Sequence, residues 1–351
     1  MNQRSRPAAR PCCSKERSMN NGLRHFQKTL VATILLNLCG LSIAQDLPAP
    51  KQNTDQPRTV TLSVIFTNRS HHSFDDVLRE EVQVFEDKVP QTIKVFSKED
   101  KPVDYAIAID TSGSFKTLLS PVVEAVKLLI NNQRDNDELF IERFVSTDKI
   151  ETVQDFTSDR STLLKPLPSL RIEGGQSAVI DAVYLAVQHV AQHRPSAERR
   201  RALVLFTDGE DRASYYTEKQ LSQLLRQNDV QVFVIGIVAQ LDAQSRQIGR
   251  SPREKAEGFI RRIAQESGGR AFFPKNVDEL RQATAQVTHD LHVQYSITYE
   301  STGNGSKGDF RSVEVKVVES TGRQTLSAVS RPGYYINPPV LDPKDKKKSK
   351  K

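Results

Sequence analysis

With 351 residues, the chain is long enough to bury a sizeable core in one large domain or two smaller ones. Its net charge of +7 is concentrated at the two ends: the first 44 residues carry +6 and the last ten carry +4, which leaves −3 between them. A basic folded face, the usual electrostatic footprint of a nucleic-acid-binding protein, is therefore not indicated, and we expect no nucleic-acid partner.

Residues 1–44 have the pattern of a secretory signal peptide. A basic stretch precedes an apolar run over residues 29–41, which is too short to span a membrane comfortably, and small residues precede a cut after Ala44. Met19, the only other methionine, offers a start of ordinary length. We expect export to the periplasm, the cell envelope or the outside, with an uncleaved signal anchor as the alternative.

All three cysteines lie in this N-terminal segment, at Cys12, Cys13 and Cys39. A lipoprotein signal at Cys39 is disfavoured, because Leu38 is bulky where a small residue is required. After removal of the signal peptide the chain contains no thiol, no disulfide and no cysteine metal site.

A proline-containing polar segment at 45–58 predicts a linker. The alternating, β-branched residues 59–67 then predict a strand, and residues 80–97 predict two more strands joined by a turn at Asp87 and Lys88. We therefore assign residues 59–100 to the first part of an all-β module.

From residue 103, strands alternate with amphipathic helices of 10–15 residues. Several of the strands are nearly continuous apolar runs, which is typical of parallel strands buried on both faces. This order predicts an α/β domain over residues 101–292, with a doubly wound, mostly parallel, Rossmann-like sheet. The strands are expected at 103–109, 139–145, 150–156, 202–207, 230–237 and 270–273, and the helices at 120–132, 159–165, 178–192, 217–227, 254–266 and 278–291.

After Leu291 the β pattern returns in three pieces, at 293–301, 310–318 and 326–336. We expect residues 293–337 to pair with the first β segment into one small sandwich-like module, with the α/β domain inserted into it. The lysine-rich residues 338–351 predict a disordered, solvated tail. Any membrane contact is expected only through the signal segment or this tail.

Three loops at the carboxyl ends of predicted parallel strands carry oxygen ligands. Asp110, Ser112 and Ser114 follow the first strand of the α/β domain, Ser177 opens a long helix behind two glycines, and Asp208 ends a buried strand. Each loop alone has a simpler explanation as a helix cap or a turn. Together they supply two carboxylates and three hydroxyls, a donor set that suits Mg²⁺ or Mn²⁺.

Two other sites were weighed against this one. An aspartic protease needs a glycine two residues after its aspartate, whereas Gly113 follows Asp110 by three and the sequence has no second copy of the motif. His189 and His193 have a spacing that suits zinc on a helix, but no glutamate stands between them in the catalytic position and no third ligand is evident. A hydrolase of the aspartic-protease type is therefore a remote alternative.

The motif Asp110-x-Ser112-x-Ser114, the loop "GGQSA" and the strand end "LFTDGED" resemble the metal-ion-dependent adhesion site of a von Willebrand factor type A domain. The resemblance covers about residues 101–292, and the flanks resemble a bacterial exported subgroup in which a β module brackets the A domain. It implies hydroxyl ligation by Ser112, Ser114 and Ser177. It also implies that Asp110 and Asp208 contact the ion directly or through water.

Two positions depart from the family pattern. Ser177 stands where the family usually has threonine, so it keeps the oxygen and loses the methyl group that restricts χ1. Gln176 stands where a second glycine is common.

The resemblance implies an exported, non-enzymatic binding or adhesion protein whose Mg²⁺ (or Mn²⁺) ion accepts an Asp or Glu carboxylate of a partner protein. The alternative is a structural scaffold of an envelope assembly, in which the ion only stabilises the loops.

Overall fold

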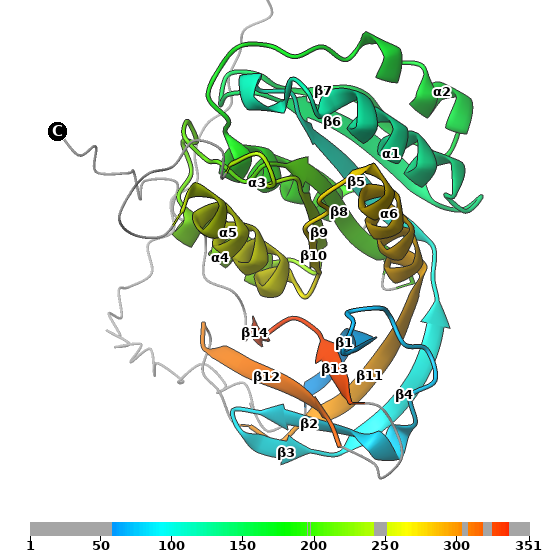
Figure 1. Ribbon diagram of the computed structural model, residues 1–351. Helices are drawn as coiled ribbons and strands as arrows, with labels where there is room; N and C mark the ends of the chain where they lie inside the picture. Colours follow the sequence, from blue (N-terminus) through cyan, green and yellow to red (C-terminus); the bar gives the residue numbers. More distant parts are fainter. Residues whose placement is uncertain are drawn as a thin grey trace, which may run out of the picture. The chain divides into compact units, whose positions relative to one another are not determined.

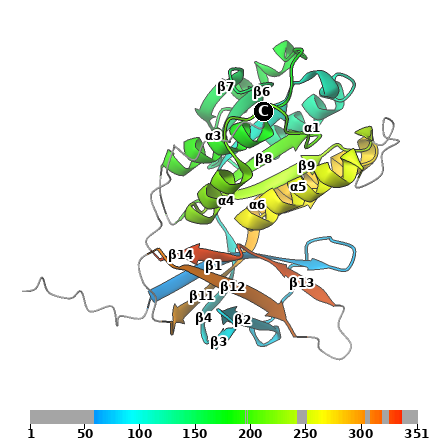
Figure 2. The same cartoon turned by 90° about the vertical axis from the view of Figure 1, so that its left-hand side faces the viewer.

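The computed structural model describes residues 58–194, 196, 198–241, 251–303, 308–318 and 325–336. The predicted signal peptide, nearly all of the linker and the lysine-rich tail lie outside these residues. The domain limits stay predictions, whereas the arrangement of the strands and helices can be compared directly with the sequence (Figures 1 and 2).

A six-stranded sheet forms the centre of the α/β domain, in the order β10-β9-β8-β5-β6-β7. All neighbouring strands are parallel except β7, which runs antiparallel to β6. Every residue of β5 is buried, as expected for a central strand covered on both faces. The predicted doubly wound, mostly parallel sheet is confirmed. Its strands are β5 (Val103–Asp110), β6 (Glu138–Phe144), β7 (Ile150–Thr157), β8 (Arg200–Thr207), β9 (Gln231–Gly236) and β10 (Ala271–Phe272).

Helices cover both faces of this sheet (Figure 1). One core lies under α3, α4 and α5, and a second core lies under α1, α2 and α6. Because side chains alternate along a strand, each strand contributes apolar residues to both cores. The helices are α1 (Leu119–Asn131), α2 (Arg160–Leu164), α3 (Val179–Gln192), α4 (Glu218–Gln227), α5 (Pro252–Ser267) and α6 (Val277–His292), with 3₁₀ turns η1 (Arg79–Glu81), η2 (Gly113–Phe115) and η3 (Leu167–Ser169).

The two flanks form a β sandwich of two four-stranded sheets, β13-β1-β11-β4 and β14-β12-β2-β3. Their inner faces share one apolar core, to which β1 contributes every second residue from Val60 to Phe66. The predicted module built from both flanks is therefore present. Its strands are β1 (Arg58–Asn68), β2 (Val82–Glu86), β3 (Val89–Gln91), β4 (Ile93–Asp100), β11 (Val293–Ser301), β12 (Phe310–Val317), β13 (Leu326–Val329) and β14 (Gly333–Tyr335).

Strand division inside the sandwich differs from the prediction in two places. Residues 80–97 were expected to form two strands, but the chain changes sheet after Gln91, so three strands result. The expected turn is present, since Asp87 and Lys88 both have positive φ, at 47° and 68°. Residues 326–336 likewise divide into β13 and β14, which lie in different sheets on either side of Pro332.

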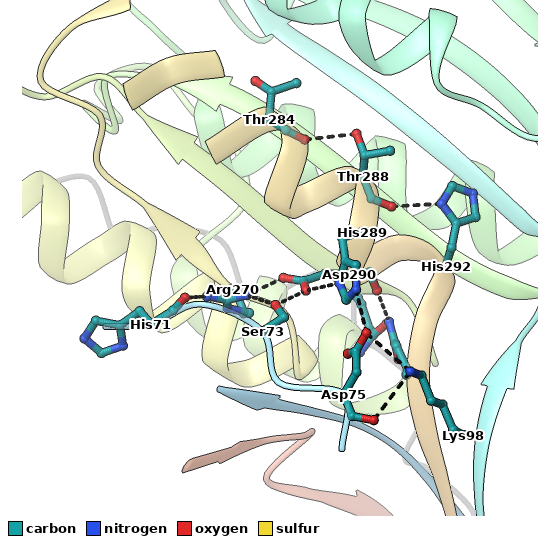
Figure 3. Close-up of polar contacts among 12 residues, drawn as sticks. His71, Ser73, Asp75, Lys98, Arg270, Thr284, Thr288, His289, Asp290 and His292 are labelled. Atoms are coloured by element: carbon teal, nitrogen blue, oxygen red, sulfur yellow. Dashed lines mark hydrogen bonds and ion pairs between the residues drawn. The ribbon is translucent and has the colours of Figure 1, made fainter. Parts of the chain in front are cut away.

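A buried polar network joins the sandwich to the α/β domain (Figure 3). Arg270 forms a buried ion pair with Asp290 of α6 and donates to the backbone carbonyl of His71. Ser73, from the same segment after β1, donates to Asp290 and accepts from Arg270. The segment that follows β1 is thereby fixed against α6.

Candidate metal centre

The predicted site residues lie at the carboxyl edge of the central sheet. Asp110 is the last residue of β5, and Asp208 directly follows β8, its parallel neighbour. Ser177 lies in the loop before α3, while Ser112 and Ser114 follow β5. Loops converge at this edge in open α/β sheets, which is why three segments distant in the sequence meet here.

Asp110 is fully buried and is contacted by all three loops. Its Oδ2 accepts hydrogen bonds from Ser177 Oγ at 3.0 Å and from Thr207 Oγ1 at 2.9 Å. Its Oδ1 accepts from the backbone N–H of Ser112 at 3.0 Å. These bonds orient the carboxylate and join the loops to one another.

The same environment makes the charge on Asp110 costly. Burial and, to a smaller extent, the nearby charge of Asp208 raise the pKa of Asp110 to about 6, despite a partial offset from the hydrogen bonds of Ser112 and Thr207. Two like charges held in a site with little water repel each other. A cation between the loops would remove this cost.

Asp208 is the second buried carboxylate, and one of its oxygens has no partner. Oδ1 accepts from the backbone N–H of Glu210 at 3.0 Å, whereas Oδ2 is buried without a hydrogen-bond partner in the described part of the chain. Burial raises the pKa of Asp208, against an offset from the hydroxyl of Ser114. Buried oxygens without partners are rare and call for an explanation.

The serine hydroxyls complete the donor set. Ser112 is buried, Ser114 is exposed, and their Oγ atoms are 3.2 Å apart. All five predicted residues therefore gather in one place with oxygen donors only, and one of them reaches solvent. This set, together with the unpartnered oxygen of Asp208, fits a hard divalent cation.

Ser177 does not act as a helix cap. The N-cap position of α3 is Ala178, which makes no side-chain cap bond, and the Ser177 hydroxyl donates to Asp110 instead. The loop in front of it requires glycine at position 175, where φ is 154° and a Cβ atom would lie 2.7 Å from Cγ1 of Val145. Gln176, which lies between Gly175 and Ser177 in the sequence, is exposed.

Two residues that organise the site were not identified from the sequence. Thr207 donates to Asp110, and its place directly before Asp208 at a strand end was the available signal. Asp181, buried in the first turn of α3, accepts from the backbone N–H groups of Tyr215 and Tyr216 and from Thr147. An aspartate in a first helical turn usually indicates only a favourable helix-dipole interaction, so this role is not recognisable from the sequence.

His193 takes part in a different cluster at the opposite, amino end of β5. Its ring lies within 4.8 Å of carboxylate oxygens of Asp104 and Glu138, a group that offers metal-ligand atoms. However, Arg199 binds both oxygens of Asp104, and Nε2 of His193 lies 2.9 Å from Glu138. The cluster is thus already an ion-pair network. His189 stacks on Phe140 instead of joining it.

Comparison with known proteins agrees with this geometry. The family model of the von Willebrand factor type A domain matches residues 104–286, more than half of the chain. The chain belongs to the von Willebrand factor type A domain family. The A domain accordingly contains the predicted site.

Among the described residues, no helix of sufficient length and apolarity to span a bilayer is present.

Solved structures similar to this A-domain protein come from several organisms. An aerotolerance-related membrane protein from Bacteroides fragilis is 21% identical with a TM-score of 0.41, covering 53% of this chain and 98% of that one. A von Willebrand factor type A protein from Catenulispora acidiphila is 14% identical with a TM-score of 0.44, covering 82% and 74%. Manganese-loaded TRAP protein from Plasmodium vivax is 18% identical with a TM-score of 0.42, covering 67% and 96%. No curated protein matches the chain.

Proposed function

We propose that the protein is an exported, non-enzymatic binding protein whose A domain holds Mg²⁺, or Mn²⁺, and captures a partner protein through an acidic side chain. The observation that carries this proposal is the buried, unpartnered Oδ2 of Asp208 beside the buried carboxylate of Asp110. A divalent cation would satisfy that oxygen and offset the repulsion between the two carboxylates.

The five oxygen-bearing side chains would share the binding of the ion. Asp110 and Asp208 supply the negative charge, and Ser112, Ser114 and Ser177 supply neutral oxygens. Bound there, the ion acts as a Lewis acid that attracts an oxygen ligand from outside. Asp110 and Asp208 would balance the formal charge of a divalent ion, so a partner's carboxylate would be bound through an open coordination position and not through an excess of positive charge. Thr207 and the Ser112 N–H orient Asp110.

A charge-assisted contact of this kind contributes about 1–3 kcal/mol, so the surrounding loops must supply most of the affinity for the partner. Tyr215 is a candidate for such a contact, because it is 52% exposed and its loop is fixed to α3 through Asp181. Export is supported by the signal-peptide pattern of residues 1–44.

A scaffold role, in which the ion only stabilises the loops, is the second candidate. It is favoured by the hydrogen bonds from Ser177 and Thr207 to Asp110, which already tie the loops together. The two roles differ in whether an interaction depends on the metal.

Capture from an envelope extract by the immobilised full chain, with Mg²⁺ and with chelator, tests the proposal. We expect a partner that is retained only with Mg²⁺ and that is lost with Asp110→Ala. Asp135→Ala is the matched control, because the Asp135 side chain is 98% exposed and precedes β6, at the amino edge of the sheet opposite the site. If Asp110→Ala abolishes Mg²⁺ binding in calorimetry but every captured protein is retained, the scaffold role replaces adhesion.

A further inference from the structure

The outer face of the first sandwich sheet carries a group of hydroxyls. In the pairing of β1 with β11, Thr61 lies opposite Thr298 and Ser63 lies opposite Ser296. Alternate residues of β1, such as Leu62, enter the sandwich core, so these hydroxyls lie on the other face. Ser296 is 7% exposed.

Arg200, at the start of β8, brings a buried positive charge to this face. It is 8% exposed and donates to the backbone carbonyls of His292, at 2.5 Å, and Glu99, at 3.0 Å. It forms no ion pair with a carboxylate in the described part of the chain. Burial lowers the pKa of Arg200 to about 10, because only carbonyl dipoles and the more distant charge of Glu99 compensate the guanidinium.

A cavity of about 360 Å³ lies between the hydroxyl face and Arg200. We call it the junction cavity, because it is lined from both the sandwich and the α/β domain. Its lining includes the hydroxyl residues Thr61, Ser63, Ser296 and Thr298. Its charged lining residues are Lys101, Arg199, Arg200, Arg201, Glu99 and Asp229.

Two of these four cationic side chains form ion pairs with carboxylates, and two do not. Lys101 is paired with Glu99 at 2.6 Å. Arg199 is neutralised by both oxygens of Asp104, which lies outside the lining. Arg201, like Arg200, makes no ion pair in the described chain, but it donates to the carbonyl of Ala191 in α3, at 3.3 Å, so its guanidinium lies on the opposite face of β8.

We propose that the junction cavity binds a phosphate group, either free inorganic phosphate or the head of a phosphate monoester. The lining carries four cationic side chains against two carboxylates, and this excess of positive charge matches a ligand with close to two negative charges at neutral pH. The guanidinium of Arg200 and the hydroxyls of Ser63 and Ser296 can donate to a tetrahedral acceptor from opposite walls. The volume leaves room for the organic part of an ester.

Phosphate bound here would also act on the junction between the two parts of the fold. Arg200 holds the carbonyl of Glu99, where β4 leads into β5, and that of His292, where α6 leads into β11. Anion binding would offset the repulsion among the cations around both connections, so phosphate should raise the thermal stability. The cavity lies at the amino end of β8, opposite the proposed metal site, and does not depend on it.

Isothermal titration calorimetry on the full chain tests this proposal, with EDTA present and ionic strength held constant. We expect saturable binding of inorganic phosphate with one site per chain, and no such binding of chloride. The double variant Ser63→Ala/Ser296→Ala should weaken phosphate binding at least about tenfold, because two donors to a charged ligand are lost. Thr59→Ala is the matched control, since Thr59 is exposed on the same strand and outside the cavity.

A gain of affinity provides a readout that a structural role would not produce. Asp229 lines the cavity, and its side chain is 63% exposed, so Asp229→Asn should leave the fold intact and tighten phosphate binding about threefold by removing a like charge. Arg200→Gln should weaken phosphate binding, and circular dichroism checks that this variant is folded. The serine variants test the same site without removing the buried guanidinium.

Titration with glycerol phosphate distinguishes a site for free inorganic phosphate from a site for a phosphate monoester. Tighter binding of the monoester assigns the cavity to an ester, and equal or weaker binding assigns it to the free ion. Absence of saturable binding for both ligands overturns the proposal. Binding that is unchanged in both the double serine variant and Arg200→Gln overturns it as well.

Discussion

Ser177 and Asp110 are 67 residues apart in the chain, and a hydrogen bond of 3.0 Å joins Ser177 Oγ to Asp110 Oδ2. The loop before α3 is thereby fixed to the end of β5. A single hydroxyl thus has two roles, since it positions a buried carboxylate and belongs to the proposed donor set for the ion.

Ser177→Thr should strengthen Mg²⁺ binding about twofold. Threonine keeps the hydroxyl, and its methyl group restricts χ1, so less rotamer freedom is lost when the ion binds. Ser177→Ala should weaken binding at least about tenfold through loss of the oxygen. Calorimetry with Mg²⁺ compares the three proteins, and equal affinity of wild type and Ser177→Ala would contradict a role for this hydroxyl.

Asp208→Asn should stabilise the metal-free protein and abolish the stabilisation by Mg²⁺. The change removes one of two buried like charges, which we expect to raise the free energy of unfolding by about 1–2 kcal/mol in chelator. Mg²⁺ should then raise the melting temperature of the wild type but not of the variant. A variant that is still stabilised by Mg²⁺ would place the ion elsewhere.

Glu142 should make the protein less stable as the pH rises. Burial in β6 raises the pKa of Glu142 from about 4.5 to about 8, and one carboxyl oxygen has no partner in the described chain. The folded state therefore holds a proton that the unfolded state loses. The stabilisation is complete below pH 4.5 and is lost as the pH rises to about 8.

Urea denaturation of wild type and Glu142→Gln across pH 5 to pH 8 isolates this group. The glutamine side chain is neutral at every pH, so its advantage over glutamate should grow by roughly 3 kcal/mol from acid to neutral pH. A difference between the two proteins that is constant with pH would show that Glu142 keeps an ordinary pKa.

Asp290→Asn should destabilise the junction between the sandwich and the α/β domain. It leaves the buried guanidinium of Arg270 without its carboxylate, which typically costs about 3–5 kcal/mol. Asp278→Asn on the same helix is the control, because that side chain is 85% exposed and its loss should cost less than about 0.5 kcal/mol. Equal destabilisation by the two changes in urea would show that the buried pair contributes nothing specific.

Much of the fold follows from local patterns in the sequence. The apolar runs of β5, β8 and β9 and the helical spacing between them predict a doubly wound sheet, because burial on both faces demands such sequences. The places where a strand changes sheet were not predictable. At Gln91 the β pattern continues in the sequence, so packing between the two sheets decides where the chain crosses. At Pro332 the Pro-Gly pair marks a break, but not that the next strand joins the other sheet.

The candidate site shows the same division. Asp110, Ser112, Ser114, Ser177 and Asp208 were identified because their loops follow strands or open a helix at one edge of the sheet. Thr207 and Asp181 act through long-range hydrogen bonds, to Asp110 and to the N–H groups of residues 215 and 216. The place of Thr207 at a strand end was a weak signal, whereas nothing in the local sequence indicates the partners of Asp181.

The pairing of β4 with β11 has a mechanical consequence. Asp100 lies opposite Val293, so the chain enters and leaves the α/β domain on neighbouring strands, about 4.8 Å apart. Residues 58 and 336, the outermost described positions, both belong to the sandwich. A pulling force applied there is carried by strand pairing within the sandwich, where β1 lies between β13 and β11. The A domain is a side branch whose two connections are held together by the β4–β11 ladder, so it carries no load while the sandwich stays folded.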